Sequence, residues 1–124
     1  MKNFFEFSLP LDSGTLMTTV RLTVGGLAAA AGLDVDVGED FKVCVTESLL
    51  IFKRNGFTSA RAHFELLNDG LSAVLSAQAP SSEGEADGLE DEISYALLGA
   101  LVDEVCFERI EGRVNGITLI KKSV

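Results

Sequence analysis

The stretch Phe41–Phe57, FKVCVTESLLIFKRNGF, decides the fold of this chain because it predicts a helix that is buried on most of its sides. Its apolar residues recur at spacings of four and three, which is typical of one helical face: Phe41, Val45, Leu49 and Phe52. We expect the helix to begin near Gly38 or Glu39 and to end at Asn55-Gly56. One carboxylate, Glu47, stands inside the apolar run, and its role is the main question that the sequence raises.

A strand and another helix are expected before this stretch. Residues 3–9, NFFEFSL, show the short-period alternation of a first strand. Pro10, Asp12 and Ser13 then mark a turn and a helix cap. The helix that follows ends at Gly32, and its apolar face is formed by residues spaced four and three apart: Leu16, Val20, Val24, Leu27 and Ala31.

The second half of the chain predicts two hairpins and a third helix. Asn68-Asp69-Gly70 is a strong hairpin signal between strands at residues 59–67 and 71–79. The polar segment 80–92 predicts a mobile loop. A third helix then runs to about Asp103, with an apolar stripe at helical spacing: Leu89, Ile93, Leu97 and Leu101. Residues 104–110 and 115–122 form a closing hairpin. Antiparallel strands with helices that share one face predict an α+β, two-layer sandwich in a single domain, residues 1–124.

Charge and composition exclude several classes of function. The formal net charge is −9, from 19 acidic and 10 basic residues, which argues against binding to nucleic acids or anionic membranes. Lys53, Arg54, Lys121 and Lys122 form no basic track. We expect no signal peptide and no membrane span, so the expected location is the cytoplasm. Two isolated cysteines, Cys44 and Cys106, are interpreted as reduced cytosolic thiols.

Two stretches of the sequence resemble the anti-sigma-factor serine kinases of bacterial partner-switching systems. The first is VRLTVGGLAAAAGLDVDVGEDFKVCVTESLL, residues 20–50, and the second is ALLGALVDEVCFERIEG with ITLIKK, within residues 96–122. With the order of elements, the resemblance covers nearly the whole chain. It implies the histidine kinase/Hsp90/gyrase type of ATPase fold, with helices on one face of a mostly antiparallel mixed sheet.

The resemblance also implies positions for the catalytic and metal-binding groups. Kinases of this family carry a glutamate on the second helix that polarises the nucleophile, and Glu47 matches it. An asparagine four residues later binds Mg²⁺ in the family, but here that position is Ile51, which has no oxygen for a hard cation. A basic or imidazole side chain often follows four residues further on; this chain has Asn55.

Two nucleotide-contacting turns of the family are replaced as well. The Asp-x-Gly-x-Gly turn that binds adenine aligns with AQAPS, where Ala77, Ala79 and Ser81 stand in place of the aspartate and both glycines. The Gly-x-Gly that cradles phosphate aligns with Glu92 and Ser94. Nearby carboxylates would repel a triphosphate by up to about 1 kcal/mol each, screened by salt: Glu83, Glu85, Asp87, Glu90 and Asp91.

Three lost elements predict a pseudokinase: a regulatory, protein-binding module without ATP, metal or kinase activity, in which Glu47 is a vestigial general base. The resemblance implies a protein partner in transcription regulation, namely a sigma factor, an antagonist domain or a kinase paralogue, and a homodimer. We expect the contact surface to be the first helix and the sheet edge.

Two other hypotheses remain open at this point. One is an active ATP- and Mg²⁺-dependent serine kinase with a rebuilt pocket, in which Asn55 supplies the missing oxygen ligand. The other is a binding domain for a small uncharged ligand, held by Ile51, Ala77 and Ala79. The single histidine, His63, is expected to face outward from its strand, and a nucleophilic set of Cys44, Glu47 and His63 has no motif to support it.

Overall fold

A computed structural model describes residues 3–81 and 84–123 of the chain. Within these residues the order of strands and helices is the expected one, and their bounds are β1 (Phe4–Pro10), α1 (Gly14–Ala30), α2 (Val35–Arg54), β2 (Phe57–Leu67), β3 (Gly70–Pro80), α3 (Leu89–Leu101), β4 (Glu104–Ile110) and β5 (Arg113–Lys122). The α+β class is confirmed.

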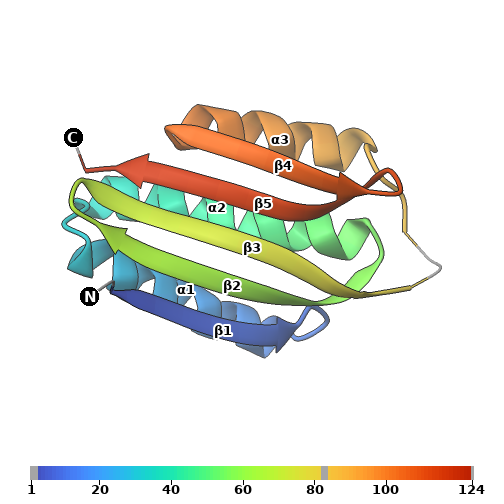
Figure 1. Cartoon of the computed structure of the whole chain (residues 1–124), viewed down its shortest axis with the longest axis horizontal. Coiled ribbons are helices and arrows are strands. Elements are labelled where there is room, and N and C mark those ends of the chain that lie inside the picture. Colours follow the sequence, from blue (N-terminus) through green and yellow to red (C-terminus); the bar gives the residue numbers. More distant parts are fainter. Residues whose placement is uncertain (1–2, 82–83, 124) are drawn as a thin grey trace.

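The strands form one five-stranded sheet in the order β1-β2-β3-β5-β4. Every neighbouring pair is antiparallel, so the expectation of a mixed sheet was wrong. The three helices lie together behind one face of the sheet, which gives the two expected layers (Figure 1). Alternation along β2 explains this arrangement, because Ala60, Ala62 and Phe64 are buried while Arg61 and His63 belong to the opposite face.

Helix α2 is the centre of the helical layer. It packs against α1, α3 and strands β2, β3 and β5, and it buries large side chains along its whole length: Phe41, Val45, Leu49, Ile51 and Phe52. It begins at Val35, about one turn before the expected start, because the Asp34 side chain caps it by accepting a hydrogen bond from the Val37 N–H at 3.0 Å. The prediction of a helix buried on most sides is confirmed.

Helix α3 is rotated about its axis relative to the sequence prediction, although Leu101, the last residue of the expected stripe, still packs against the core. The expected inward stripe began with Leu89 and Ile93, but both side chains are exposed. The helix instead buries Asp91, Ser94 and Leu98, which are also spaced for one helical face. Hydrogen bonds between α3 and α2 outweigh the simple apolar pattern here, and they define the candidate site.

Candidate functional site

Five polar residues on two antiparallel helices form a hydrogen-bonded cluster between α2 and α3. We call it the α2–α3 polar network, and it consists of Glu47, Arg54, Asn55, Asp91 and Ser94. The α2 members are spaced seven and eight residues apart, so they share one side of the helix. The α3 members are spaced by three and face them. The fold therefore brings together three of the site residues predicted from the sequence: Glu47, Asn55 and Ser94.

Glu47 is joined to α3 through Ser94, whose hydroxyl also contacts Arg54. The Ser94 hydroxyl donates to Glu47 Oε2 at 2.7 Å and accepts from an Arg54 terminal nitrogen at 2.7 Å. Arg54 Nε also donates to Asp91 Oδ1 at 2.6 Å, in an ion pair whose carboxylate is buried. The network holds two carboxylates and one guanidinium, a net charge of −1, which disfavours a further anion.

Asn55 uses both atoms of its amide inside the protein. Its nitrogen donates to the Ile51 carbonyl at 2.8 Å and to Asp91 Oδ2 at 2.9 Å. Its oxygen accepts from the Val114 N–H on β5 at 2.9 Å. Asn55 is fully buried, and so it ties the end of α2 to α3 and to the sheet rather than offering an oxygen to a metal.

Ile51 lies in the hydrophobic core and presents no surface to a ligand. Among residues 3–81 and 84–123, no group of three or more His, Cys, Asp or Glu side chains is arranged to hold a metal ion. Ile51, where the resemblance implies a Mg²⁺ ligand, and Asn55, the alternative oxygen ligand, therefore do not fit the cation, because neither offers an accessible oxygen.

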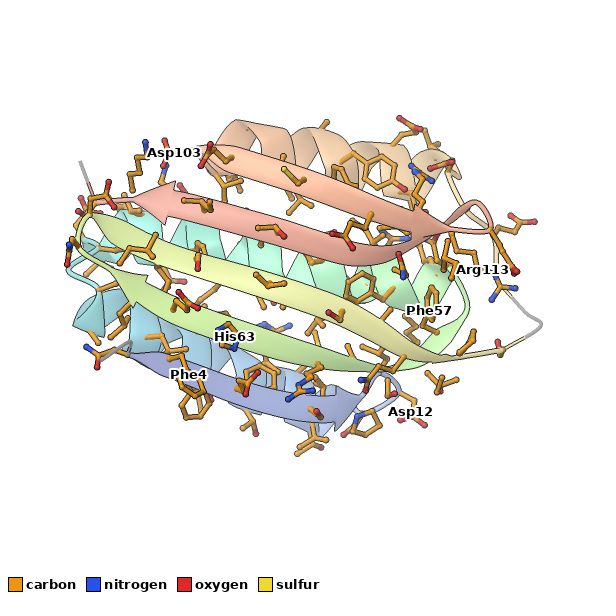
Figure 2. All side chains as sticks on the ribbon, viewed as in Figure 1. Phe4, Asp12, Phe57, His63, Asp103 and Arg113 are labelled. Atoms are coloured by element: carbon orange, nitrogen blue, oxygen red, sulfur yellow. The ribbon has the colours of Figure 1, made fainter. Side chains whose placement is uncertain are left out.

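The end of β3 contacts the turn that follows α2. Thr58 Oγ donates to the Ala79 carbonyl at 2.9 Å, and the Ser81 N–H donates to the Gly56 carbonyl at 2.8 Å. Ala77 is half-buried in the sheet opposite Ala60. These residues close the end of the sheet around α2, at the same end where Figure 2 shows Phe57 and Arg113.

A cavity of about 330 Å³ opens beside this turn. Its lining includes one predicted site residue, Ser81, and two charged side chains, Asp12 and Lys53. Neither Ile51 nor the alanines at 77 and 79 belong to its lining.

The second half of the expected mobile loop is held in place. The Glu85 N–H donates to the Arg54 carbonyl at 2.9 Å, and Gly84 lies against the backbone of Gly56. Asp87 accepts hydrogen bonds from Arg109 at 2.9 and 3.1 Å and from the Tyr95 hydroxyl at 2.9 Å. Residues 89–92 already belong to α3, where Glu92 is exposed; Glu83 lies outside the described residues.

The pKa shifts around Asp87 are consistent with a loop segment that is held against β4 and α3. The pKa of Asp87 is lowered, first by its hydrogen bonds from Arg109 and then by the one from Tyr95. Burial, with the hydrogen bond to Asp87, raises the pKa of Tyr95 to about 12. The neutral phenol and the charged pair therefore both persist at neutral pH, and they join the start of α3 to β4.

None of the nucleophile candidates is placed to react. Ser94 and Glu47 have the spacing of a nucleophile and its base, but Ser94 is only 2% exposed. Burial raises the pKa of Cys44 to about 12, which keeps it a neutral thiol. His63 faces the opposite side of the sheet from α2, as expected, so it does not meet Cys44 or Glu47.

His63 belongs to a separate cluster on the open face of the sheet. Its Nδ1 contacts Glu6 Oε2 at 2.9 Å and its Nε2 contacts Glu65 Oε1 at 3.1 Å, while Arg61 lies 3.6 Å from the same Glu6 oxygen. The ring also stacks on Phe4, with centroids 5.3 Å apart (Figure 2). The pKa of His63 is raised, first by the bond to Glu6 and then by that to Glu65.

Sequence reasoning missed Arg54 and Asp91, which hold the network together. The sequence presents Arg54 only as a member of a possible basic track, and Asp91 only as one of several carboxylates that would repel a triphosphate. A usable signal exists, because Asp91, Ser94 and Leu98 repeat at spacings of three and four and so predict a second, mixed face of the same helix.

No protein-family model matches this sequence, and a search of curated proteins finds no significant match. The fold class therefore stands on the geometry of the chain itself. No helix within residues 3–81 and 84–123 combines the length and the apolar character needed to cross a bilayer.

Proposed function

We propose that this chain is a regulatory protein-binding module on a histidine kinase/Hsp90-type ATPase scaffold, without ATP binding or kinase activity. It acts in the cytoplasm by holding a protein partner: a sigma factor, an antagonist domain or a kinase paralogue. A homodimer is part of the proposal, as the resemblance to anti-sigma kinases implies.

One observation supports this proposal: the α2–α3 polar network engages Glu47, Asn55 and Ser94, three of the positions that the resemblance implies for the nucleotide site. Glu47 accepts a hydrogen bond from Ser94, both amide atoms of Asn55 form hydrogen bonds within the protein, and Ile51 is in the core. Binding of Mg²⁺-ATP there would have to break a buried ion pair and expose apolar core. Both steps oppose binding by several kcal/mol.

The surface of α1 and β1 supports the protein-binding part of the proposal. A groove of about 210 Å³ runs between this helix and this edge strand, and its lining is mostly apolar. Phe5 and Leu16 line it and remain partly exposed. Strand β1 is also an edge of the sheet, so one side of its backbone is open to pairing.

Thermal unfolding with and without millimolar Mg²⁺-ATP or ADP tests the first part. We expect no shift, because a ligand at about 100 times its dissociation constant would stabilise the protein by roughly 2.7 kcal/mol and raise the midpoint by several degrees. A clear shift that disappears on removal of Mg²⁺ would refute the proposal and restore the kinase hypothesis. Glu47→Gln would then be the first variant to assay for phosphoryl transfer.

Co-purification with a matched control tests the partner surface. Phe5→Ser with Leu16→Ser removes apolar area from the α1–β1 groove, whereas Val74→Ser removes a similarly exposed side chain from the open face of the sheet. We expect the groove variant to lose the partner that the native chain retains, and Val74→Ser to retain it. Equal retention by both variants would remove the groove from the proposal.

A further inference from the structure

Helix α3 buries two polar side chains beside Leu98, while two large apolar side chains in its first half face outward. Asp91 and Ser94 are 1% and 2% exposed, while Leu89 and Ile93 are 78% and 61% exposed. The hydrophobic effect alone would favour the opposite orientation. The inward polar groups are satisfied by the α2–α3 polar network, but within the part of the chain that the structure describes nothing covers the outward apolar groups.

The outward apolar residues lie next to one another in a continuous stripe and are not isolated on the surface. At 100° per residue, a line of apolar side chains follows one side of α3: Leu89, Ile93, Ala96, Leu97 and Ala100. From Leu89 to Ala100 the stripe extends for about 16 Å along the helix axis. This length matches three turns of a partner helix lying along it.

Charge around the stripe distinguishes between possible occupants. Glu90 and Glu92 lie on either side of it, and α3 carries no lysine or arginine. A second copy of this chain would bring two such pairs of carboxylates together, which is repulsive. A helix with an apolar stripe between lysines or arginines would meet opposite charge on both sides.

We propose that the outer face of α3 is a docking surface for a basic amphipathic helix of a partner protein. The proposal extends the protein-binding function to a second surface, separate from the groove between α1 and β1. It does not depend on the absence of ATP binding or on the identity of the partner.

A designed peptide tests this surface directly. The probe is a fluorescent helix of about 18 residues, long enough for stable turns, with leucines at positions i, i+4, i+7 and i+11 and lysines on both sides. One control peptide has the same composition in scrambled order, and another has glutamates in place of the lysines. Binding is measured by fluorescence anisotropy at about 0.15 M salt, where weak long-range attraction is screened.

Matched variants locate the binding. Leu89→Ser with Ile93→Ser removes the two large exposed side chains of the stripe. Leu22→Ser with Val35→Ser removes two side chains of similar exposure, 73% and 79%, elsewhere. We expect the α3 variant to weaken binding by at least about tenfold, which equals about 1.4 kcal/mol, and the control to change it by less than about twofold. Glu90→Gln with Glu92→Gln should weaken binding and reduce its dependence on salt.

Several outcomes would overturn the proposal. They are equal binding by the α3 variant and the native chain, equal binding of the scrambled peptide, and a greater loss in the Leu22 and Val35 control. NMR shifts of the native chain on addition of the peptide provide an independent reading, and they should concentrate on residues 89–100. Self-association that Leu89→Ser with Ile93→Ser abolishes would assign the surface to a second copy instead. Failure of the peptide alone leaves the groove between α1 and β1 unaffected, so the two proposals can fail separately.

Discussion

Replacement of Asp91 by alanine is the most informative test of the α2–α3 polar network. The Asp91 carboxylate accepts hydrogen bonds from Arg54 Nε at 2.6 Å, Asn55 Nδ2 at 2.9 Å and the Asp87 N–H at 3.2 Å. It therefore joins the end of α2, the start of α3 and the segment before it. Asp91→Ala leaves the Arg54 charge without its buried counterion.

The expected loss follows from what each former partner can still do. Removal of one member of a buried ion pair costs about 3–5 kcal/mol. Arg54 is partly exposed, so its guanidinium can turn toward water, and Asn55 keeps its bond to the Ile51 carbonyl. These two alternatives place the expected loss near the lower end, at about 3 kcal/mol. For a chain of this size the melting temperature should fall by roughly 10 °C.

Urea unfolding followed by circular dichroism measures this loss, and Glu90→Ala is the matched control. Glu90 is the adjacent carboxylate on α3, it is exposed, and its oxygen lies 3.8 Å from the same Arg54. A surface pair of this kind contributes about 0–1 kcal/mol, so the control should stay close to the native value. A loss below about 1 kcal/mol for Asp91→Ala would show that hydrogen bonding does not hold α3, and it would refute the reasoning.

Three further predictions concern other parts of the fold. Glu6 and Glu65 raise the pKa of His63 above 6.5, so protonated His63 stabilises the native state. This contribution to the unfolding free energy is complete below pH 6.5 and is lost as the pH rises through the native pKa. His63→Ala should remove this pH dependence from urea unfolding measured across that range. Gly84→Ala should lower the unfolding free energy by at least about 2 kcal/mol, since the φ of Gly84 is +120° and a Cβ would lie 2.5 Å from the Gly56 nitrogen. Gly88 has open space around it, so the control Gly88→Ala should change the unfolding free energy by less than about 0.5 kcal/mol. Ile51→Asn introduces the asparagine that the resemblance implies as a Mg²⁺ ligand. Because residue 51 is in the core, this change should destabilise the chain by about 3 kcal/mol and create no Mg²⁺ affinity by calorimetry. Measurable Mg²⁺ binding would contradict that placement.

Local pattern and turn chemistry are what made most of the fold predictable. Asn68-Asp69-Gly70 joins β2 to β3 as expected, and the apolar spacing in Phe41–Phe57 correctly gave the central, buried helix. The order of strands in the sheet was not predictable in the same way. It depends on which strand lies beside β3, and long-range pairing of that kind leaves no local signal in one sequence.

The orientation of α3 shows why the candidate site was only partly predictable. Apolar periodicity favours burial of Leu89 and Ile93. It carries no information about hydrogen-bond partners, and Asp91 can be buried because Arg54 and Asn55 supply hydrogen-bond donors. The side-chain donors that make burial of this carboxylate favourable lie 36 and 37 residues away in the chain. Glu47, Asn55 and Ser94 were identified through the resemblance, but Arg54 and Asp91, which link them into one network, were not.

The two faces of α3 are coupled by thermodynamics if both proposals hold. A partner that binds the outer stripe recognises α3 only in its docked position, and the inner network sets how much of the population is docked. Because apparent affinity falls in proportion to the docked fraction, a variant that loosens the network must also weaken the partner. By reciprocity, the partner must stabilise the network by the same free energy. A buried cluster that has no accessible chemistry would then act on function through the position of the helix.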